Sequence, residues 1–177
     1  MLHELLLKRH SIRRYTDSPV DPESVRKVLE AALLAPTSKN KRPWQFVVVE
    51  NRETLDRLAS CKDFGTKPIA TAAFAVVVVV DSSQSDCFVE DSSIAAAYMQ
   101  LQATDLGLGA CWIQVRNRFT ADGTPAEDIV RETLGIPEML TVECIVTVGH
   151  PDEERRPVDP EKLLWEKVHI ESWKAVE

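Results

Sequence analysis

The sequence lacks the features that mark disulfide-stabilised, metal-stabilised and membrane-spanning proteins. Its four cysteines, Cys61, Cys87, Cys111 and Cys144, form no CxxC pair, and no histidine cluster has zinc-ligand spacing. We therefore expect reduced thiols and no metal site. The most apolar run, Phe74 to Val80, is too short to cross a bilayer, and no basic stretch followed by a long apolar one opens the chain. These absences predict a cytoplasmic protein with no membrane partner.

Positive charge is also in short supply. The 177 residues include 21 Lys and Arg against 28 Asp and Glu, which gives a net charge of −7. Surplus negative charge repels nucleic-acid phosphates, so we expect no nucleic-acid partner. The composition, 44% hydrophobic and 28% charged, is that of an ordinary folded protein. The length fits a single domain over residues 1–177, whose core is large enough to need no disulfide.

The spacing of apolar residues predicts an alternation of helices and strands. Four segments have apolar positions at helical spacing: 21–34, 51–60, 91–106 and 125–134. Four apolar or β-branched runs predict strands: 44–50, 75–80, 110–115 and 141–149. The run at 75–80 does not alternate with polar residues, so we expect a central strand covered by helices on both faces. Gly107 lies where the third helix needs a left-handed residue to end.

The last 28 residues, 150–177, differ in composition from the rest of the chain. They contain three prolines, many charged residues and two tryptophans, Trp165 and Trp173. Such a segment suits an arm that lies over a surface, and a surface that accepts two tryptophans fits a second subunit. The alternative is that residues 150–177 pack along the edge of their own domain.

Against the acidic background stands the sequence RHSIRRY, residues 9–15, which we call the basic segment. In an extended conformation Arg9, Ser11 and Arg13 leave the chain on one side, because side chains alternate. Two guanidiniums and a hydroxyl are donors that suit a phosphate dianion, and His10 adds to the local positive potential. A solvated turn whose cations pair with nearby carboxylates is the alternative.

Two further stretches offer groups that suit a ligand. APTSKNKRPW, residues 35–44, is called here the polar loop, and its Thr37, Ser38 and Asn40 suit hydrogen bonds to a polar ring edge. GLGACWIQ, residues 107–114, can present backbone N–H groups to a flat ligand. Its glycines follow a helix and precede a strand, the reverse of the dinucleotide-binding order. Ordinary turns and a core strand explain both stretches equally well.

Nothing in the sequence indicates a protein nucleophile. Cys111 has no basic neighbour in the sequence, and no GxSxG motif is present. We therefore name no catalytic side chain.

Four motifs, taken in order, make the sequence resemble the nitroreductase family in its short form. They are RHSIRRY at 9–15, APTSKN–x–x–PW at 35–44, GLGACWI at 107–113 and GHP at 149–151. The resemblance implies an α+β fold with a central mixed β-sheet of four to five strands flanked by helices. It also implies an intertwined homodimer in which the C-terminal arm, 150–177, packs on the partner subunit.

The resemblance further implies two FMN sites at the subunit interface, each built from three groups of residues. The phosphate is held by Arg9, Ser11 and Arg13 with the neighbouring His10, and by Arg155 and Arg156. The ring is bordered from the other subunit by Pro36, Thr37, Ser38 and Asn40. Its N5 edge receives backbone from Trp112, Ile113 and Gln114. Two departures concern the substrate side: Arg42 stands where the family often has Gln, and Gln114-Val115 replaces a Glu-Gly pair. Nothing in residues 61–70 matches the family's Asn and Lys at the pyrimidine edge.

The implied activity is that of an FMN-dependent NAD(P)H oxidoreductase. Hydride comes from NADH or NADPH, and a nitroaromatic, quinone or similar small acceptor is then reduced in the same pocket, by a ping-pong mechanism. Alternatives within the family are reductive dehalogenation and flavin breakdown. From another class, the protein would be a non-redox FMN-binding or regulatory dimer.

Overall fold

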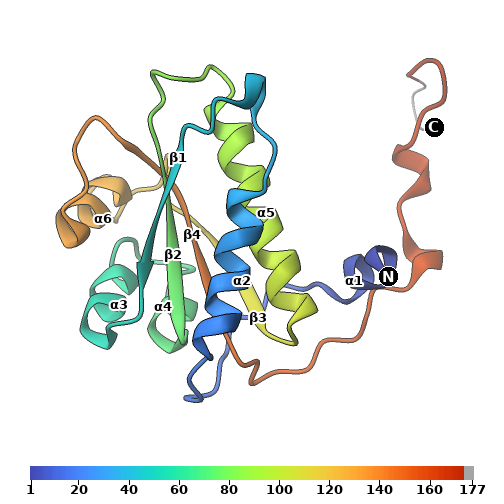
Figure 1. The fold of residues 1–177 in the computed structure, drawn as a ribbon, viewed down its shortest axis with the longest axis horizontal. Coiled ribbons are helices and arrows are strands. Elements are labelled where there is room, and N and C mark those ends of the chain that lie inside the picture. Colours follow the sequence, from blue (N-terminus) through green and yellow to red (C-terminus); the bar gives the residue numbers. More distant parts are fainter. Residues whose placement is uncertain (174–177) are drawn as a thin grey trace.

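The computed structural model describes residues 1–173 and contains one four-stranded sheet with helices on both faces (Figure 1). The strands are β1 (Trp44–Val49), β2 (Phe74–Val80), β3 (Gly109–Gln114) and β4 (Thr141–Gly149). Their order is β1-β2-β4-β3, and every neighbouring pair is antiparallel. The predicted mixed sheet is thus antiparallel across its four strands. The parallel pairing in residues 1–173 is an isolated bridge between Ser11 and Ala110, where the basic segment extends the sheet beyond β3.

The helices follow the predicted segments, with two additions. They are α1 (Leu2–Lys8), α2 (Pro22–Leu33), α3 (Arg52–Ala59), α4 (Lys67–Thr71), α5 (Phe88–Asp105) and α6 (Ala126–Leu134). Short 3₁₀ turns cover Ser38–Asn40, Pro160–Lys162 and Trp165–Lys167. Local capping explains the boundaries: the side chains of Asp21 and Asn51 accept N–H groups in the first turns of α2 and α3. Gly107 follows α5 with a φ of 74°, the left-handed conformation that ends a helix.

The core lies on both faces of β2, whose seven residues are all buried. Phe74, Val76 and Val78 face α2 and α5, while Ala75, Val77 and Val79 face α3, α4 and α6. Figure 1 shows these two helical layers on either side of the sheet. The non-alternating run therefore forms the central, doubly covered strand that its sequence predicts.

After β4 the chain leaves the sheet, and the C-terminal segment, residues 152–173, does not return to it. Its first part runs beside the N-terminal region, where the Asp152 N–H donates to the Arg14 carbonyl at 2.9 Å and the Val158 N–H to that of Leu7 at 2.8 Å. Beyond this point the arm stands away from the sheet (Figure 1), and Trp165 and Trp173 are 67% and 76% exposed. The start of the segment is thus attached to its own domain, whereas its tryptophan side chains are largely exposed. The predicted packing on a partner subunit stays a prediction, and its last residues, 174–177, lie outside the described part.

No helix within residues 1–173 combines the length and apolar character needed to cross a membrane. The cytoplasmic location stays a prediction.

Candidate functional site

The basic segment lies along the outer edge of β3, where hydrogen bonds hold it extended. The Ile12 N–H donates to the Ala110 carbonyl at 2.9 Å. The Tyr15 hydroxyl donates to the Ile12 carbonyl at 2.7 Å, and burial raises the pKa of this phenol. A Cβ on Gly109 would lie 2.7 Å from Ile12, so only glycine permits this close approach. With Ile12 and Tyr15 buried, the charged groups of the segment are directed away from the core.

The cations of the segment have no carboxylate partner of their own. No ion pair in residues 1–173 involves Arg9 or Arg13, and the Arg13 guanidinium contacts only the Ser11 carbonyl, at 3.4 Å. The carboxylate pairing of the alternative is thus not seen at these two residues within residues 1–173. Two guanidiniums thus remain available to an anionic ligand.

A carboxylate far along the chain joins the C-terminal segment to the basic segment. Glu153 accepts the Arg13 backbone N–H at 2.6 Å and the Arg155 guanidinium at 2.9 Å. The Arg13 N–H, and to a smaller extent the Arg155 charge, lower the pKa of the Glu153 carboxyl. Glu153 thereby holds Arg155 near the basic segment, and the predicted role of Arg155 at a phosphate stays a prediction. Arg156 is exposed and makes no hydrogen bond or ion pair with the rest of the described chain.

A cavity of about 450 Å³ opens beside Arg13, and no carboxylate lines it. Its lining residues are Arg13, Arg14, Gly65, Lys67, Pro68 and Thr71. Sequence reasoning found no residue in 61–70 to match the family's pyrimidine-edge Lys. The structure places Lys67 at this cavity, in the first turn of α4. The available signal was a lysine two residues after Gly65, in the segment between the second predicted helix and the central strand.

The outer edge of β3, along which the basic segment lies, also presents backbone N–H groups near the end of the strand. The Val115 N–H donates inward to the Glu143 carbonyl of β4, at 3.3 Å, whereas the Ala110 carbonyl accepts Ile12 on the outside. Because backbone groups alternate along a strand, Trp112 and Gln114 direct their N–H groups outward, and Ile113 directs its own toward β4. The Lys62 ammonium donates to the Gln114 carbonyl at 2.7 Å, and burial lowers the pKa of this amine. The edge therefore offers two N–H donors beside a cation.

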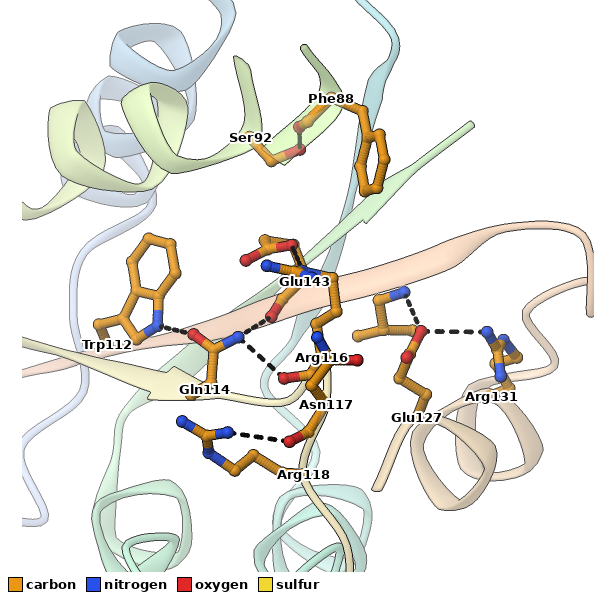
Figure 2. A network of polar contacts seen from close by, with 11 residues as sticks. Phe88, Ser92, Trp112, Gln114, Arg116, Asn117, Arg118, Glu127, Arg131 and Glu143 are labelled. Atoms are coloured by element: carbon orange, nitrogen blue, oxygen red, sulfur yellow. Dashed lines mark hydrogen bonds and ion pairs between the residues drawn. The ribbon is translucent and has the colours of Figure 1, made fainter. Parts of the chain in front are cut away.

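A polar network fixes the side chain of Gln114 (Figure 2). Its Oε1 accepts the Trp112 indole N–H at 2.9 Å, and its Nε2 donates to the Arg116 carbonyl at 3.1 Å. The Arg116 guanidinium pairs at 2.6 Å with Glu143, which is 2% exposed and lies at a bulge of β4. Gln114 acts as acceptor and donor at once, which a carboxylate would not do. This explains why Gln114 stands where the family has Glu. A carboxylate at this position would place an acceptor oxygen against the Glu143 carbonyl oxygen, which needs a donor.

The polar loop lies at the opposite corner of the sheet (Figure 1). Trp44, its last residue, pairs with Val80 on β2, which in turn pairs with Thr141 at the start of β4. Gly109, beside the basic segment, pairs with Gly149 at the end of β4. β1 and β3 are also opposite edges. One protomer therefore does not bring the polar loop to the basic segment, and the predicted site residues fall into two separate groups.

The first group consists of Arg9, His10, Ser11, Arg13, Trp112, Gln114 and Arg155, and the second of Pro36, Thr37, Ser38 and Asn40. Each group contains or adjoins a buried polar atom with no partner in the described chain, His10 Nε2 in the first and Trp44 Nε1 next to the second. Unpaired guanidiniums, outward N–H donors and such orphaned atoms fit a ligand with a phosphate and a flat ring that carries hydrogen-bond acceptors.

The comparison with known families decides the classification. The model of the Nitroreductase family matches residues 6–61 and 59–150. The chain belongs to the nitroreductase family. It is 34% identical over 175 residues to a "Putative NADH dehydrogenase/NAD(P)H nitroreductase" of Archaeoglobus fulgidus, covering 96% of this chain and 97% of the relative. A protein of the same name from Methanothermobacter thermautotrophicus is 35% identical over 179 residues, covering 96% and 86%.

Solved structures agree with this nitroreductase assignment. An "FMN-dependent Nitroreductase" from Clostridium difficile R20291 superposes with a TM-score of 0.94 at 44% identity, covering 97% of this chain and 99% of the other. A "Putative NADH dehydrogenase/NAD(P)H nitroreductase" from Parabacteroides distasonis superposes with a TM-score of 0.88 at 31% identity, covering 97% of this chain and 98% of the other. The predicted α+β nitroreductase fold is confirmed, and family membership with the FMN-dependent neighbour supports FMN, the predicted cofactor.

Proposed function

We propose that this nitroreductase is an FMN-dependent NAD(P)H oxidoreductase. The observation that carries the proposal is the basic segment on the outer edge of β3. There Arg9 and Arg13 form no ion pair within residues 1–173, and the outward N–H groups of Trp112 and Gln114 lie beside them. Bound FMN would supply hydride-transfer chemistry, from NADH or NADPH to a nitroaromatic, quinone or similar small acceptor that uses the same pocket in turn.

Each part of the site has a distinct role in this proposal. Arg9, Ser11 and Arg13, with Arg155 held near them by Glu153, would bind the phosphate. Lys67, at the cavity beside Arg13, would place positive charge near the ring, where fixed cations stabilise negative charge that accumulates on reduction. The outward N–H groups of β3 would orient the ring edge. No protein side chain needs to act as nucleophile.

We also propose that the site is completed by a second copy of the chain. The polar loop and the basic segment lie at opposite corners of one protomer, so only a partner can place both around one ligand. An apolar groove of about 670 Å³ between α1, α2 and α5 supports an interface there, because it is lined largely by exposed or half-buried apolar side chains such as Leu2, Leu34 and Tyr98.

FMN titration of the purified protein tests the proposal. We expect a yellow, FMN-binding protein whose flavin absorbance is bleached by NADH or NADPH without oxygen and restored by an acceptor. Arg13→Ala should weaken FMN binding by about 1.5–3 kcal/mol, the range for a hydrogen bond to a charged group. Arg57→Ala, on the exposed face of α3, is the matched control and should leave the affinity unchanged.

Other outcomes of the same experiment point to the competing functions. If FMN binds and neither nicotinamide bleaches it, a non-redox FMN-binding or regulatory dimer is the better account. If FMN does not bind at all, the basic segment serves another phosphate-bearing ligand and the proposal is wrong.

A further inference from the structure

A single buried carboxylate ties the polar loop to the helical layer. Asp91, in the first turn of α5, is 2% exposed. One of its oxygens accepts the Ser38 backbone N–H at 2.7 Å, and the other accepts the Ser85 hydroxyl at 3.1 Å. No ion pair within residues 1–173 involves Asp91. A carboxylate buried without a cation is costly unless its oxygens are hydrogen-bonded, so these two donors are essential to it.

The loop that Asp91 holds has an unfavourable backbone conformation. Lys39, Asn40 and Arg42 have φ values of 51°, 55° and 50°, and the loop contains no glycine to adopt them without cost. Left-handed conformations cost a side-chain-bearing residue about 1–2 kcal/mol each, less for Asn. Such a shape persists only where surrounding contacts determine it.

Between its buried ends, Ala35 and Trp44, few hydrogen bonds tie the loop to the rest of the described protein. Within the loop, the Thr37 hydroxyl accepts the Arg42 N–H at 3.1 Å, and Arg42 donates to the Asn40 side chain at 3.0 Å. At its end, the Asp81 N–H donates to the Pro43 carbonyl at 3.2 Å. In the described residues, Asp91 is the side chain outside the loop that hydrogen-bonds to it. Its position therefore decides where the Thr37–Asn40 turn lies.

We infer that Asp91 is a positioning residue for the ring-facing half of the flavin site. The inference rests on the proposed function, in which the polar loop of one subunit borders the ring bound by the other. By fixing the Ser38 peptide, Asp91 orders Thr37, Ser38 and Asn40 before any ligand arrives, which lowers the ordering cost of binding. Because the loop faces the ring and not the phosphate, Asp91 acts on the ring part of the affinity.

This difference between ring and phosphate gives a test that a merely structural role would not satisfy. Dissociation constants are measured for FMN and for riboflavin, which lacks the phosphate. We expect Asp91→Ala to weaken both about tenfold or more, the loss of one hydrogen bond to a charged group. Arg13→Ala should weaken FMN and leave riboflavin nearly unchanged. Asp91→Asn keeps an oxygen for the Ser38 N–H and should restore both affinities to within about threefold of the original.

A reciprocal pair of variants keeps the test decisive if Asp91→Ala fails to fold. Ser38→Pro removes the N–H donor and leaves Asp91 in place. Thr37, with φ −135° and ψ 157°, already has the extended conformation that precedes proline. Ser38→Ala is the control, because it keeps the N–H and loses only the hydroxyl. We expect Ser38→Pro to weaken FMN and riboflavin alike, relative to Ser38→Ala.

The outcomes separate this inference from the proposed function. If the unaltered protein binds neither flavin, the proposed function fails. If it binds FMN, and Asp91→Ala and Ser38→Pro bind both flavins as tightly as Asp91→Asn and Ser38→Ala do, the inference is overturned. It is also overturned if the two variants lose affinity for FMN and keep their affinity for riboflavin. Mixing Asp91→Ala and Arg13→Ala protomers adds a check on the two-chain site: a mixed dimer should regain one tight site, because one of its sites carries neither substitution.

Discussion

The sheet and the C-terminal arm place their apolar side chains in opposite environments. On β2 every side chain is buried between two helical layers. On the arm, Leu164, Trp165, Val168 and Trp173 are all exposed. Residues 158–173 carry several large apolar side chains, and these stay exposed in the described part of the chain. Such an exposed apolar surface fits the proposed contact with a second subunit, whereas the sheet is complete within one chain.

The largest expected effect comes from the sheet side of this comparison. Leu58 of α3 is fully buried against the sheet, so Leu58→Ala leaves a cavity. We expect a loss of about 2–5 kcal/mol in the free energy of unfolding, measured by chemical denaturation with circular dichroism. Met139→Ala, at an 81% exposed position of the same body, should change it by less than about 0.5 kcal/mol. Equal losses for the two variants would contradict the described core.

The second effect concerns the arm and the proposed dimer. Trp165→Ala and Trp173→Ala remove large side chains that are mostly exposed in one protomer. We expect unchanged secondary structure and weaker self-association, by about 2 kcal/mol or roughly 30-fold in the dissociation constant, measured by sedimentation equilibrium. Phe119→Ala, an exposed aromatic residue before α6, is the matched control. If both tryptophan variants associate as the original protein does, the arm is not part of the interface.

How far the sequence predicted each region follows from the range of the interactions involved. The helix starts at Asp21 and Asn51 and the left-handed Gly107 depend on neighbours a few residues away, and the predicted helical segments begin or end at these positions. The helices α1 and α4, with seven and five residues, are too short for a helical period to show. Periodicity therefore recovered the sheet and its long helices and missed the short elements.

The candidate site was predictable only as separate motifs. Nothing local to Glu153 indicates that it accepts the N–H of Arg13, 140 residues earlier, or that Lys67 lines a cavity with that arginine. In the sequence, Asp91 is indistinguishable from any acidic residue near a helix N-terminus, although its carboxylate accepts the Ser38 backbone N–H. These contacts arise from tertiary packing, which is why the motifs alone did not show how the site is held.

The smallest expected effect on the free energy of unfolding comes from the junction between the sheet and the arm. Glu153 holds the start of the arm through the Arg13 N–H and the Arg155 guanidinium, and its pKa is lowered in the folded protein. The unfolded chain thus binds a proton at higher pH than the folded one, so the contribution of Glu153 is complete above its ordinary pKa of 4.5. It is lost as the pH falls through the lowered value.

Glu153→Gln isolates this contribution, because glutamine keeps an acceptor for the Arg13 N–H and loses the charge that pairs with Arg155. We expect a loss of about 0.5–1 kcal/mol at pH 7 in the flavin-free protein, and a difference from the original that shrinks as the pH falls below 4.5. Thermal unfolding across this range measures it. Glu154→Gln, at the exposed neighbouring position, should show no such difference. A gap between original and Glu153→Gln that persists or grows in acid would mean that the arm's attachment does not depend on this charge.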